Sequence, residues 1–290
     1  MKYRKVKALL YAHPVDMGGI QIRQPLPTHQ VEQVDPFLLL HHADIKVPAH
    51  VDTKHAGVGP HPHRGFSPVT FIFKGGVHHR DSRGNNSVVY EGGAQWMNAG
   101  MGVIHSERPP HDIQQRGGRQ EIIQLWVNTP AANKMDKPTS LSCGGRRCAC
   151  VEKRRRKSEG EYICRRIAGH KVGHATLRDV NAATIYMDAG GRVELPAPAS
   201  HSMLLYLLDG NITLDGHGLV EGLHAVVFEN NGDGIALTAK ENTRMLFLTG
   251  EPLSEEVVSY GPFVMNTQTQ IMEAMRDYQK GKMGVLIEDE

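Results

Sequence analysis

The sequence predicts an all-β fold in which two similar antiparallel barrels or sandwiches are followed by one short C-terminal helix. Short apolar segments recur between residues 69 and 127, and turns rich in glycine and asparagine separate them, as is typical of strands joined by tight connections. The second half of the chain repeats this scheme. A convincing helical pattern comes only after residue 266.

Length and composition agree with two domains. The chain has 290 residues, of which 40% are apolar, so it exceeds what one hydrophobic core usually organises and can bury two. We place the first domain at residues 1–132 and the second at residues 133–290, with the connection near residues 128–138.

The predicted strands of the first half follow one another closely. They are VTFIF at 69–73, SVVY at 87–90, AQWMNAG at 94–100, MGVIHSE at 101–107 and EIIQLWV at 121–127. Glycine pairs follow the first two segments, and Asn128-Thr129-Pro130 follows the last. Segments this short favour an antiparallel arrangement.

An internal duplication explains the second half. MLLYLLDG at 203–210 resembles VTFIFKG at 69–75, and EGLHAVVFENNGDG at 221–234 resembles EGGAQWMNAGMG at 91–102. The terminal helix is predicted over 267–282, with Asn266 or Thr267 as its N-cap and Gly281 as its end. Its apolar side chains are Ile271, Met272, Met275 and Tyr278.

The charge distribution argues against direct binding of nucleic acid. Nine Lys and Arg residues face three Glu between residues 146 and 166, which leaves 24 basic against 28 acidic residues elsewhere. The body is therefore mildly acidic, whereas a duplex-binding face needs many basic residues together. No stretch approaches 18 apolar residues, and the N-terminal apolar run covers only residues 8–12, so we expect a soluble, cytoplasmic protein without a membrane partner.

All four cysteines fall between residues 143 and 164, in the same basic segment. Their spacing matches no zinc pattern built on paired CxxC motifs, so we expect reduced thiols.

Two pairs of polar residues with a spacing of two indicate a metal site. His61 and His63 lie in HPHRGF, and His105 and Glu107 lie in GMGVIHSER. Because residues i and i+2 of a strand share one face, each pair projects together, and three imidazoles with one carboxylate can converge. This ligand set suits a divalent transition metal, with Fe(II) the leading candidate and Mn, Ni, Cu or Zn as alternatives.

A single H-x-H motif is more often a polar surface pair than a metal site. Here two such pairs adjoin glycine-rich turns, the duplicated half lacks both, and 12 of the 17 histidines lie at or before position 111. His78 and His79 are expected in a turn, either in solvent or behind the ligands. Arg64 should point away from the metal.

Some neighbours of the quartet are candidates for a pocket wall. These are Gln95, Trp96 and Met97, with a core position favoured for Trp96 and Met97.

HPHRGF together with QWMNAGMGVIHSE resembles the pirin family, a two-domain branch of the cupin superfamily. PVDMGG, DPFLLLHH, LWVN and GPFVMNT also resemble pirin segments, so the likeness covers nearly the whole chain. It implies two stacked antiparallel β-barrels, with one metal, usually iron, in the N-terminal barrel and none in the other. It places the ligands on the same four residues, His61, His63, His105 and Glu107.

The segment at 141–180 departs from the family. Its clustered Cys and Arg indicate a diverged loop, a basic insertion or a stretch read in a shifted frame.

The resemblance further implies a metal-dependent dioxygenase that opens the ring of flavonols such as quercetin. Glu107 would be both a ligand and the catalytic base that accepts the flavonol hydroxyl proton. Dioxygen is the second substrate, and the products are carbon monoxide and a phenolic ester. The alternatives are a different chelating substrate, or a non-enzymatic iron-containing regulator whose Fe(II) and Fe(III) forms differ in affinity for a protein partner.

Overall fold

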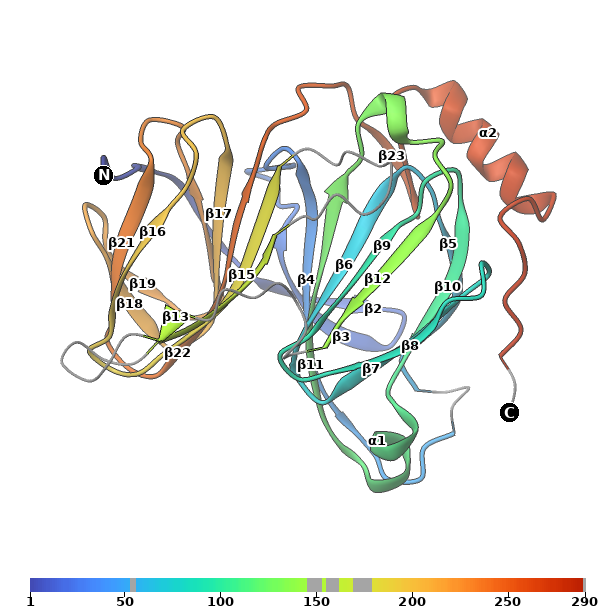
Figure 1. The fold of residues 1–290 in the computed structure, drawn as a ribbon, viewed down its shortest axis with the longest axis horizontal. Helices are drawn as coiled ribbons and strands as arrows, with labels where there is room; N and C mark the ends of the chain where they lie inside the picture. Colours follow the sequence, from blue (N-terminus) through green and yellow to red (C-terminus); the bar gives the residue numbers. More distant parts are fainter. Residues whose placement is uncertain (53–55, 145–152, 155–161, 169–178, 289–290) are drawn as a thin grey trace. The chain divides into compact units, whose positions relative to one another are not determined.

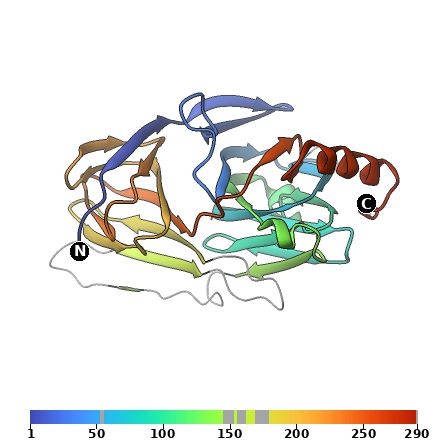
Figure 2. The same cartoon turned by 90° about the horizontal axis from the view of Figure 1, so that it is seen from above.

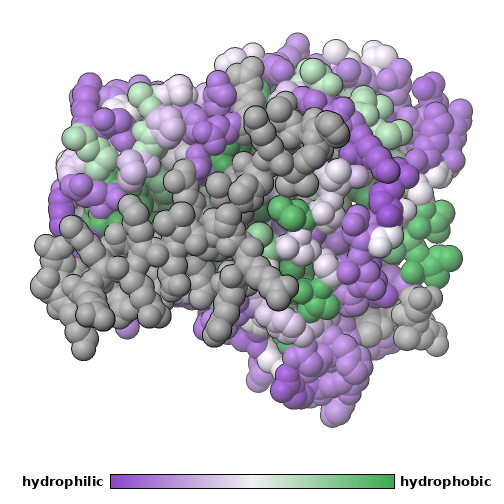
Figure 3. Space-filling view, in the orientation of Figure 1, coloured by the Kyte–Doolittle hydropathy of each residue, from purple (hydrophilic) through white to green (hydrophobic). Residues whose placement is uncertain are grey.

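A computed structural model of the chain describes residues 1–52, 56–144, 153–154, 162–168 and 179–288 (Figure 1). The expected all-β fold with a short C-terminal helix is confirmed. Neither α-helix of the described chain has the length and apolar character that a membrane span requires. The surface seen in Figure 3 is mainly hydrophilic, with scattered apolar patches, so most large apolar side chains lie inside.

The chain forms two compact units. The first barrel comprises Met17–Ile22, His42–Cys148 and Ser254–Glu290, and the second comprises Met1–Asp16, Arg23–His41 and Ala149–Leu253. Each unit therefore collects three segments, whereas the expected division at residue 132 separates two continuous ones. The N-terminal strand belongs to the second barrel because it pairs there, and the C-terminal helix belongs to the first because it packs there.

The first barrel contains two main sheets and a two-stranded one formed by β23 (Val258–Tyr260) and β24 (Phe263–Met265). One has four strands in the order β5 (Val58–His63), β10 (Val103–Arg108), β7 (Gly76–Asp81) and β8 (Asn86–Tyr90). The other has seven, in the order β12 (Thr139–Cys143), β9 (Ala94–Asn98), β6 (Phe66–Lys74), β11 (Gly118–Asn128), β4 (Phe37–Val47), β3 (Ile20–Leu26) and β2 (His13–Met17). A short helix, α1 (His111–Arg116), connects β10 to β11.

The second barrel repeats this topology. Its small sheet runs β16 (Arg192–Pro196), β21 (Gly234–Ala239), β18 (Asn211–Leu214) and β19 (Gly218–Glu221). Its large sheet runs β1 (Val6–Tyr11), β20 (His224–Phe228), β17 (Ser202–Asp209), β22 (Thr243–Gly250), β15 (Val180–Met187), β14 (Tyr162–Ala168) and β13 (Lys153–Arg154). When strands are matched in chain order, the two small sheets coincide, and so do six of the seven strands of the large sheets. The edge strands differ, because β12 follows the other strands of its sheet in the chain and β1 precedes them. The agreement confirms the predicted duplication.

The two interiors differ in polarity at matching strands. β16 and β21 correspond to β5 and β10, and they place Val193, Leu195, Ile235 and Leu237 in one buried apolar cluster. Apolar burial at these positions stabilises the second barrel where the first barrel carries histidines.

Helix α2 (Gln268–Gln279) has Thr267 as its N-cap, which is one of the two caps predicted from the sequence. The Thr267 hydroxyl accepts the backbone N–H of Gln270, whose side chain accepts the backbone N–H of Thr267 in return, at 3.3 and 3.1 Å. Of the four apolar side chains expected on one face, Ile271 is buried and Met275 packs against the same cluster, whereas Met272 and Tyr278 are 56% and 41% exposed. Figures 1 and 2 both show α2 alongside the strands of the first barrel.

One expectation for the cysteines is wrong. Cys143 is disulfide-bonded, although reduced thiols were expected throughout. Cys148 and Cys150 lie outside the described residues, as does most of the divergent segment at 141–180, and Cys164 is described only by its backbone.

Candidate metal centre

Strands β5 and β10 carry all four predicted ligands. They pair antiparallel, with His105 opposite His61 and Val103 opposite His63. Because side chains two apart share a face, His61 and His63 project to one side of the small sheet, and His105 joins them from the neighbouring strand.

Three imidazoles converge at this point. The ring nitrogens of His61, His63 and His105 all lie within 4.8 Å of one another, and no other group of His, Cys, Asp and Glu in the described ranges has this spacing. The Nε2 atoms of His61 and His63 are 3.1 Å apart. Two neighbouring nitrogens bound at about 2.1 Å to one ion lie about 3 Å apart, so the separation fits a shared metal.

The other nitrogen of each β5 histidine is held by a carbonyl. Nδ1 of His61 lies 2.8 Å from the oxygen of Gly59, and Nδ1 of His63 lies 3.4 Å from the oxygen of Pro262. A carbonyl only accepts, so both protons belong on Nδ1, and two Nε2 lone pairs face each other. Lone pairs this close repel unless a cation lies between them.

His105 completes the cluster with an unsatisfied atom. Its side chain is 1% exposed, and its Nε2 has no hydrogen-bond partner. Leaving a buried polar atom unpaired costs about 1–3 kcal/mol, which a bound ion would remove. The three histidines therefore fit a metal in both donor chemistry and geometry.

Burial keeps the rings of His63 and His105 neutral. Burial lowers the pKa of His63 well below its ordinary value, and the neighbouring His61 lowers it further. Burial likewise lowers the pKa of His105, helped by the imidazoles of His61, His63 and His79. Neutral imidazole is the form that binds a metal.

Glu107 lies outside the histidine cluster. Its carboxylate is buried and accepts the Thr70 hydroxyl at 2.6 Å and the Gln124 amide at 2.6 Å. Thr70 is on β6 and Gln124 on β11, so Glu107 reaches from the small sheet to the large one. The structure thus brings three of the four predicted ligands together and places the fourth beside them in the barrel interior.

An aromatic wall adjoins the histidines. The rings of Phe66 and Trp126 lie 4.2 Å apart, and each meets the His63 ring edge-on, at 4.9 and 5.4 Å. The indole N–H of Trp126 is buried and has no partner. This wall is suited to a planar aromatic molecule with an acceptor.

Sequence reasoning placed His78 and His79 in a turn, and that placement is wrong. Both lie on β7, where His78 is partly exposed and bonds Asn86, while His79 is 1% exposed and lies 3.4 Å from His105. No local signal in the sequence marked His79, because its place beside His105 depends on the pairing of β7 with β10.

Two basic side chains brace the turn between β5 and β6. Arg64 points away from the histidines, as expected, and donates to the carbonyl of Met101 at 2.7 Å and to Asp277 of α2 at 3.1 Å. Lys134 is fully buried and donates to the carbonyls of Gly65 and Val264 at 2.6 and 3.1 Å. Gly65 has φ +86°, and a side chain there would overlap the Val264 carbonyl.

The predicted wall residues on β9 take other places. Gln95 donates to the Ser140 hydroxyl at 2.6 Å and accepts from Ser142 at 2.5 Å. Met97 is buried in a small apolar cluster, as favoured.

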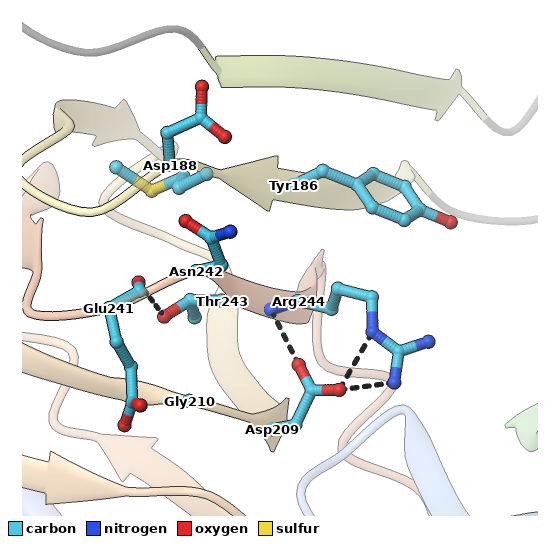
Figure 4. A pocket seen from close by; sticks show the side chains of 9 residues that line it. Tyr186, Asp188, Asp209, Gly210, Glu241, Asn242, Thr243 and Arg244 are labelled. Carbon is cyan, nitrogen blue, oxygen red and sulfur yellow. Dashed lines mark hydrogen bonds and ion pairs between the residues drawn. The ribbon is translucent and has the colours of Figure 1, made fainter.

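A hollow of about 480 Å³ lies in the second barrel, at the ends of β15, β17 and β22 (Figure 4). Arg244 and Asp209 form an ion pair on its wall, with the Arg244 Nε donating at 2.8 Å. It has no histidine in its lining, which consists of Tyr186, Met187, Asp188, Asp209, Gly210, Glu241, Asn242, Thr243 and Arg244. It is therefore separate from the metal centre.

Comparison with known proteins gives a consistent result. A protein of Pseudomonas aeruginosa named "Putative quercetin 2,3-dioxygenase" is 34% identical, over 98% of this chain and 99% of its own. A crystal structure of quercetin 2,3-dioxygenase from Acinetobacter baumannii is 32% identical, with a TM-score of 0.87, over 98% of this chain and all of that one. The Escherichia coli pirin crystallised with nickel(II) is 18% identical, with a TM-score of 0.64 over 84% of this chain and 99% of its own, and shares the fold.

Two family models match the chain, one in each half. The Pirin model matches residues 19–127, which include the histidine cluster, and the model of the Pirin C-terminal cupin domain matches residues 182–284. Models of one family thus match both the half with the histidine cluster and the half with the apolar interior: this chain belongs to the pirin family.

Proposed function

We propose that this protein is a metal-dependent dioxygenase that opens the ring of quercetin-type flavonols. The observation that carries the proposal is that the Nε2 atoms of His61 and His63 lie 3.1 Å apart with their lone pairs facing each other. The unpartnered Nε2 of His105 lies beside them. Relatives at 32–34% identity that are named as quercetin 2,3-dioxygenases support the choice of substrate.

His61, His63 and His105 would hold the ion through their Nε2 atoms, with Glu107 proposed as the fourth ligand. Three neutral imidazoles and a carboxylate suit Fe(II) best among the first-row divalent ions, with Mn, Ni, Cu and Zn as alternatives. When bound, the ion would polarise the chelating oxygens of the flavonol and mediate electron transfer to dioxygen.

Glu107 is the proposed base. Its two oxygens accept one hydrogen bond each, from Thr70 and from Gln124, so each keeps a further lone pair that could take the flavonol hydroxyl proton. Thr70 is 1% exposed and Gln124 is partly exposed, so we assign the proton to Oε2, the oxygen that accepts from Gln124. Trp126, which is partly exposed and is backed by the buried Phe66, would position the flavonol rings by stacking.

The test is turnover by protein loaded with Fe(II) under anaerobic conditions and then mixed with quercetin and air. We expect loss of the quercetin absorbance with release of one carbon monoxide per molecule. His63→Ala should lose both metal and turnover. His217→Ala, which removes an exposed histidine of the second barrel, should retain both. A metal-loaded wild type no faster than His63→Ala would contradict the enzymatic proposal and favour the regulator.

A further inference from the structure

Behind His105 runs a buried chain of hydrogen bonds. Nδ1 of His105 lies 3.4 Å from Nδ1 of His79, and Nε2 of His79 lies 3.4 Å from Oδ2 of Asp81. The three side chains are at most 5% exposed. The chain leads from the histidine cluster to the turn between β7 and β8.

That turn holds Asp81 as an acceptor. Its Oδ1 accepts the backbone N–H groups of Arg83 and Asn85 at 2.9 and 3.0 Å, and its Oδ2 accepts the Asn85 side-chain amide at 2.7 Å. Burial alone would raise the pKa of Asp81, but the hydrogen bonds from His79, Asn85 and the backbone outweigh it and hold the pKa below its usual range.

One arrangement of protons satisfies every group. A carboxylate only accepts, so His79 must carry its proton on Nε2. Its Nδ1 is then an acceptor, and His105 must carry its proton on Nδ1. The Nε2 atom of His105 is left as a lone pair that faces His61 and His63, in agreement with its lack of a partner.

We propose that His79 and Asp81 are positioning residues for the metal centre: the Asp81 carboxylate sets the tautomer of His79, which sets that of His105 and so presents Nε2 to the ion. The role in metal binding rests on the proposed function, but the tautomers exist without metal. Groups behind a ligating imidazole typically change metal affinity by about 10–100-fold.

Asp81→Asn is the sharpest test because it should reverse the direction of both hydrogen bonds between residue 81 and His105. The two backbone N–H groups at Oδ1 keep the amide oxygen on their side, so the amide NH2 takes the place of Oδ2 and faces His79. His79 then accepts at Nε2 and carries its proton on Nδ1. His105 must accept that proton at its own Nδ1, which puts a proton on the Nε2 that should bind the ion.

Two substitutions of His79 separate positioning from packing. Gln at 79 can donate to Asp81 and accept from His105 at once, so His79→Gln should retain more affinity than His79→Leu. A merely structural role would instead favour the apolar residue at this buried position. His78→Gln is the matched control, since His78 is the partly exposed neighbour on the opposite face of β7.

The experiment uses the full chain labelled with 15N. Two-bond 15N–1H spectra of the metal-free protein report each histidine tautomer, and chelator competition with Co(II) alone measures affinity. We expect Nδ1–H on His105 in the wild type and in His78→Gln. Asp81→Asn should show Nε2–H and bind Co(II) at least about tenfold more weakly.

A wild-type His105 protonated on Nε2 would overturn the proposal even if no variant folds. So would an Asp81→Asn protein with unchanged tautomers and wild-type affinity. A wild type that binds no ion, with the tautomers as stated, would instead overturn the proposed function and leave the hydrogen-bond chain in place.

Discussion

The Nε2 atoms of His61 and His63 face each other across 3.1 Å, while the Nδ1 atom of each ring points to a carbonyl oxygen. Two acceptors held this close are a source of repulsion in the metal-free fold. A bound ion converts that repulsion into two bonds, so stability and metal content should be coupled.

Removal of metal should therefore lower the Tm. An ion present at a hundred times its Kd contributes about 2.7 kcal/mol to the free energy of unfolding. Thermal denaturation with Fe(II), Co(II) or Ni(II), before and after chelation, measures the effect. His61→Ala should melt at the same temperature in all conditions; a chelator effect as large in this variant as in the wild type would place the ion elsewhere.

The contact between Thr70 and Glu107 should be worth measurable stability. Thr70→Val conserves shape and removes the hydroxyl that donates to the carboxylate at 2.6 Å. A buried charged acceptor that loses its donor costs about 1.5–3 kcal/mol, so urea unfolding should show a loss of about 2 kcal/mol. Thr213→Val, at a partly exposed position on β18, is the control and should change stability by less than about 0.5 kcal/mol.

Lys134 should make stability depend on pH. Burial lowers its pKa to about 7, from an ordinary value of 10.5. Between these two values the unfolded chain binds more protons than the folded one, so this residue's contribution to the free energy of unfolding rises with pH, by at most about 1.4 kcal/mol per unit.

The comparison with Lys134→Met isolates this effect. Urea unfolding of both proteins at several pH values from 7 to 10 should show a stability difference that grows in favour of the wild type as the pH rises. A difference that is flat over this range would mean that Lys134 remains charged in the fold, held by its carbonyl acceptors.

Asp277 should contribute more to the free energy of unfolding than its place on a surface helix indicates. Its partner Arg64 has a side chain only 4% exposed, so Asp277→Ala leaves a buried guanidinium without its carboxylate. Breaking a buried ion pair from one side costs about 3 kcal/mol, measurable by urea unfolding. Glu273→Ala, on an exposed position of the same helix, should be nearly neutral; equal losses in both variants would point to the helix rather than the pair.

Local rules were sufficient for the strands, the duplication and the three histidines of the candidate metal site. His61 and His63 share a face whatever strand lies next to them, because the period of two is local. The same is true of the turns, where glycine ends β6 and β8. The N-cap at Thr267 could be predicted for the same reason, because a cap depends only on neighbouring residues.

Non-local pairing decides what the sequence could not show. His79 lies opposite Glu107, and Asp81 opposite His105, only because β7 pairs with β10 in one register. Taken alone, the segment HHRDSRGNN at 78–86 is polar enough to predict a turn. Likewise, Glu107 bonds Thr70 and Gln124 of another sheet, and which apolar side chains of α2 are buried depends on contact with Phe263 and Ile104.

The division of the first barrel into three segments has a consequence for synthesis on the ribosome. Pro262, whose carbonyl orients His63, and Asp277, which holds Arg64, are translated more than a hundred residues after the ligands themselves. The second barrel has all its strands by residue 250. The second barrel therefore has all its strands while the three histidines of the candidate metal site still lack these two partners, and we expect that site to be completed only late in translation or after release.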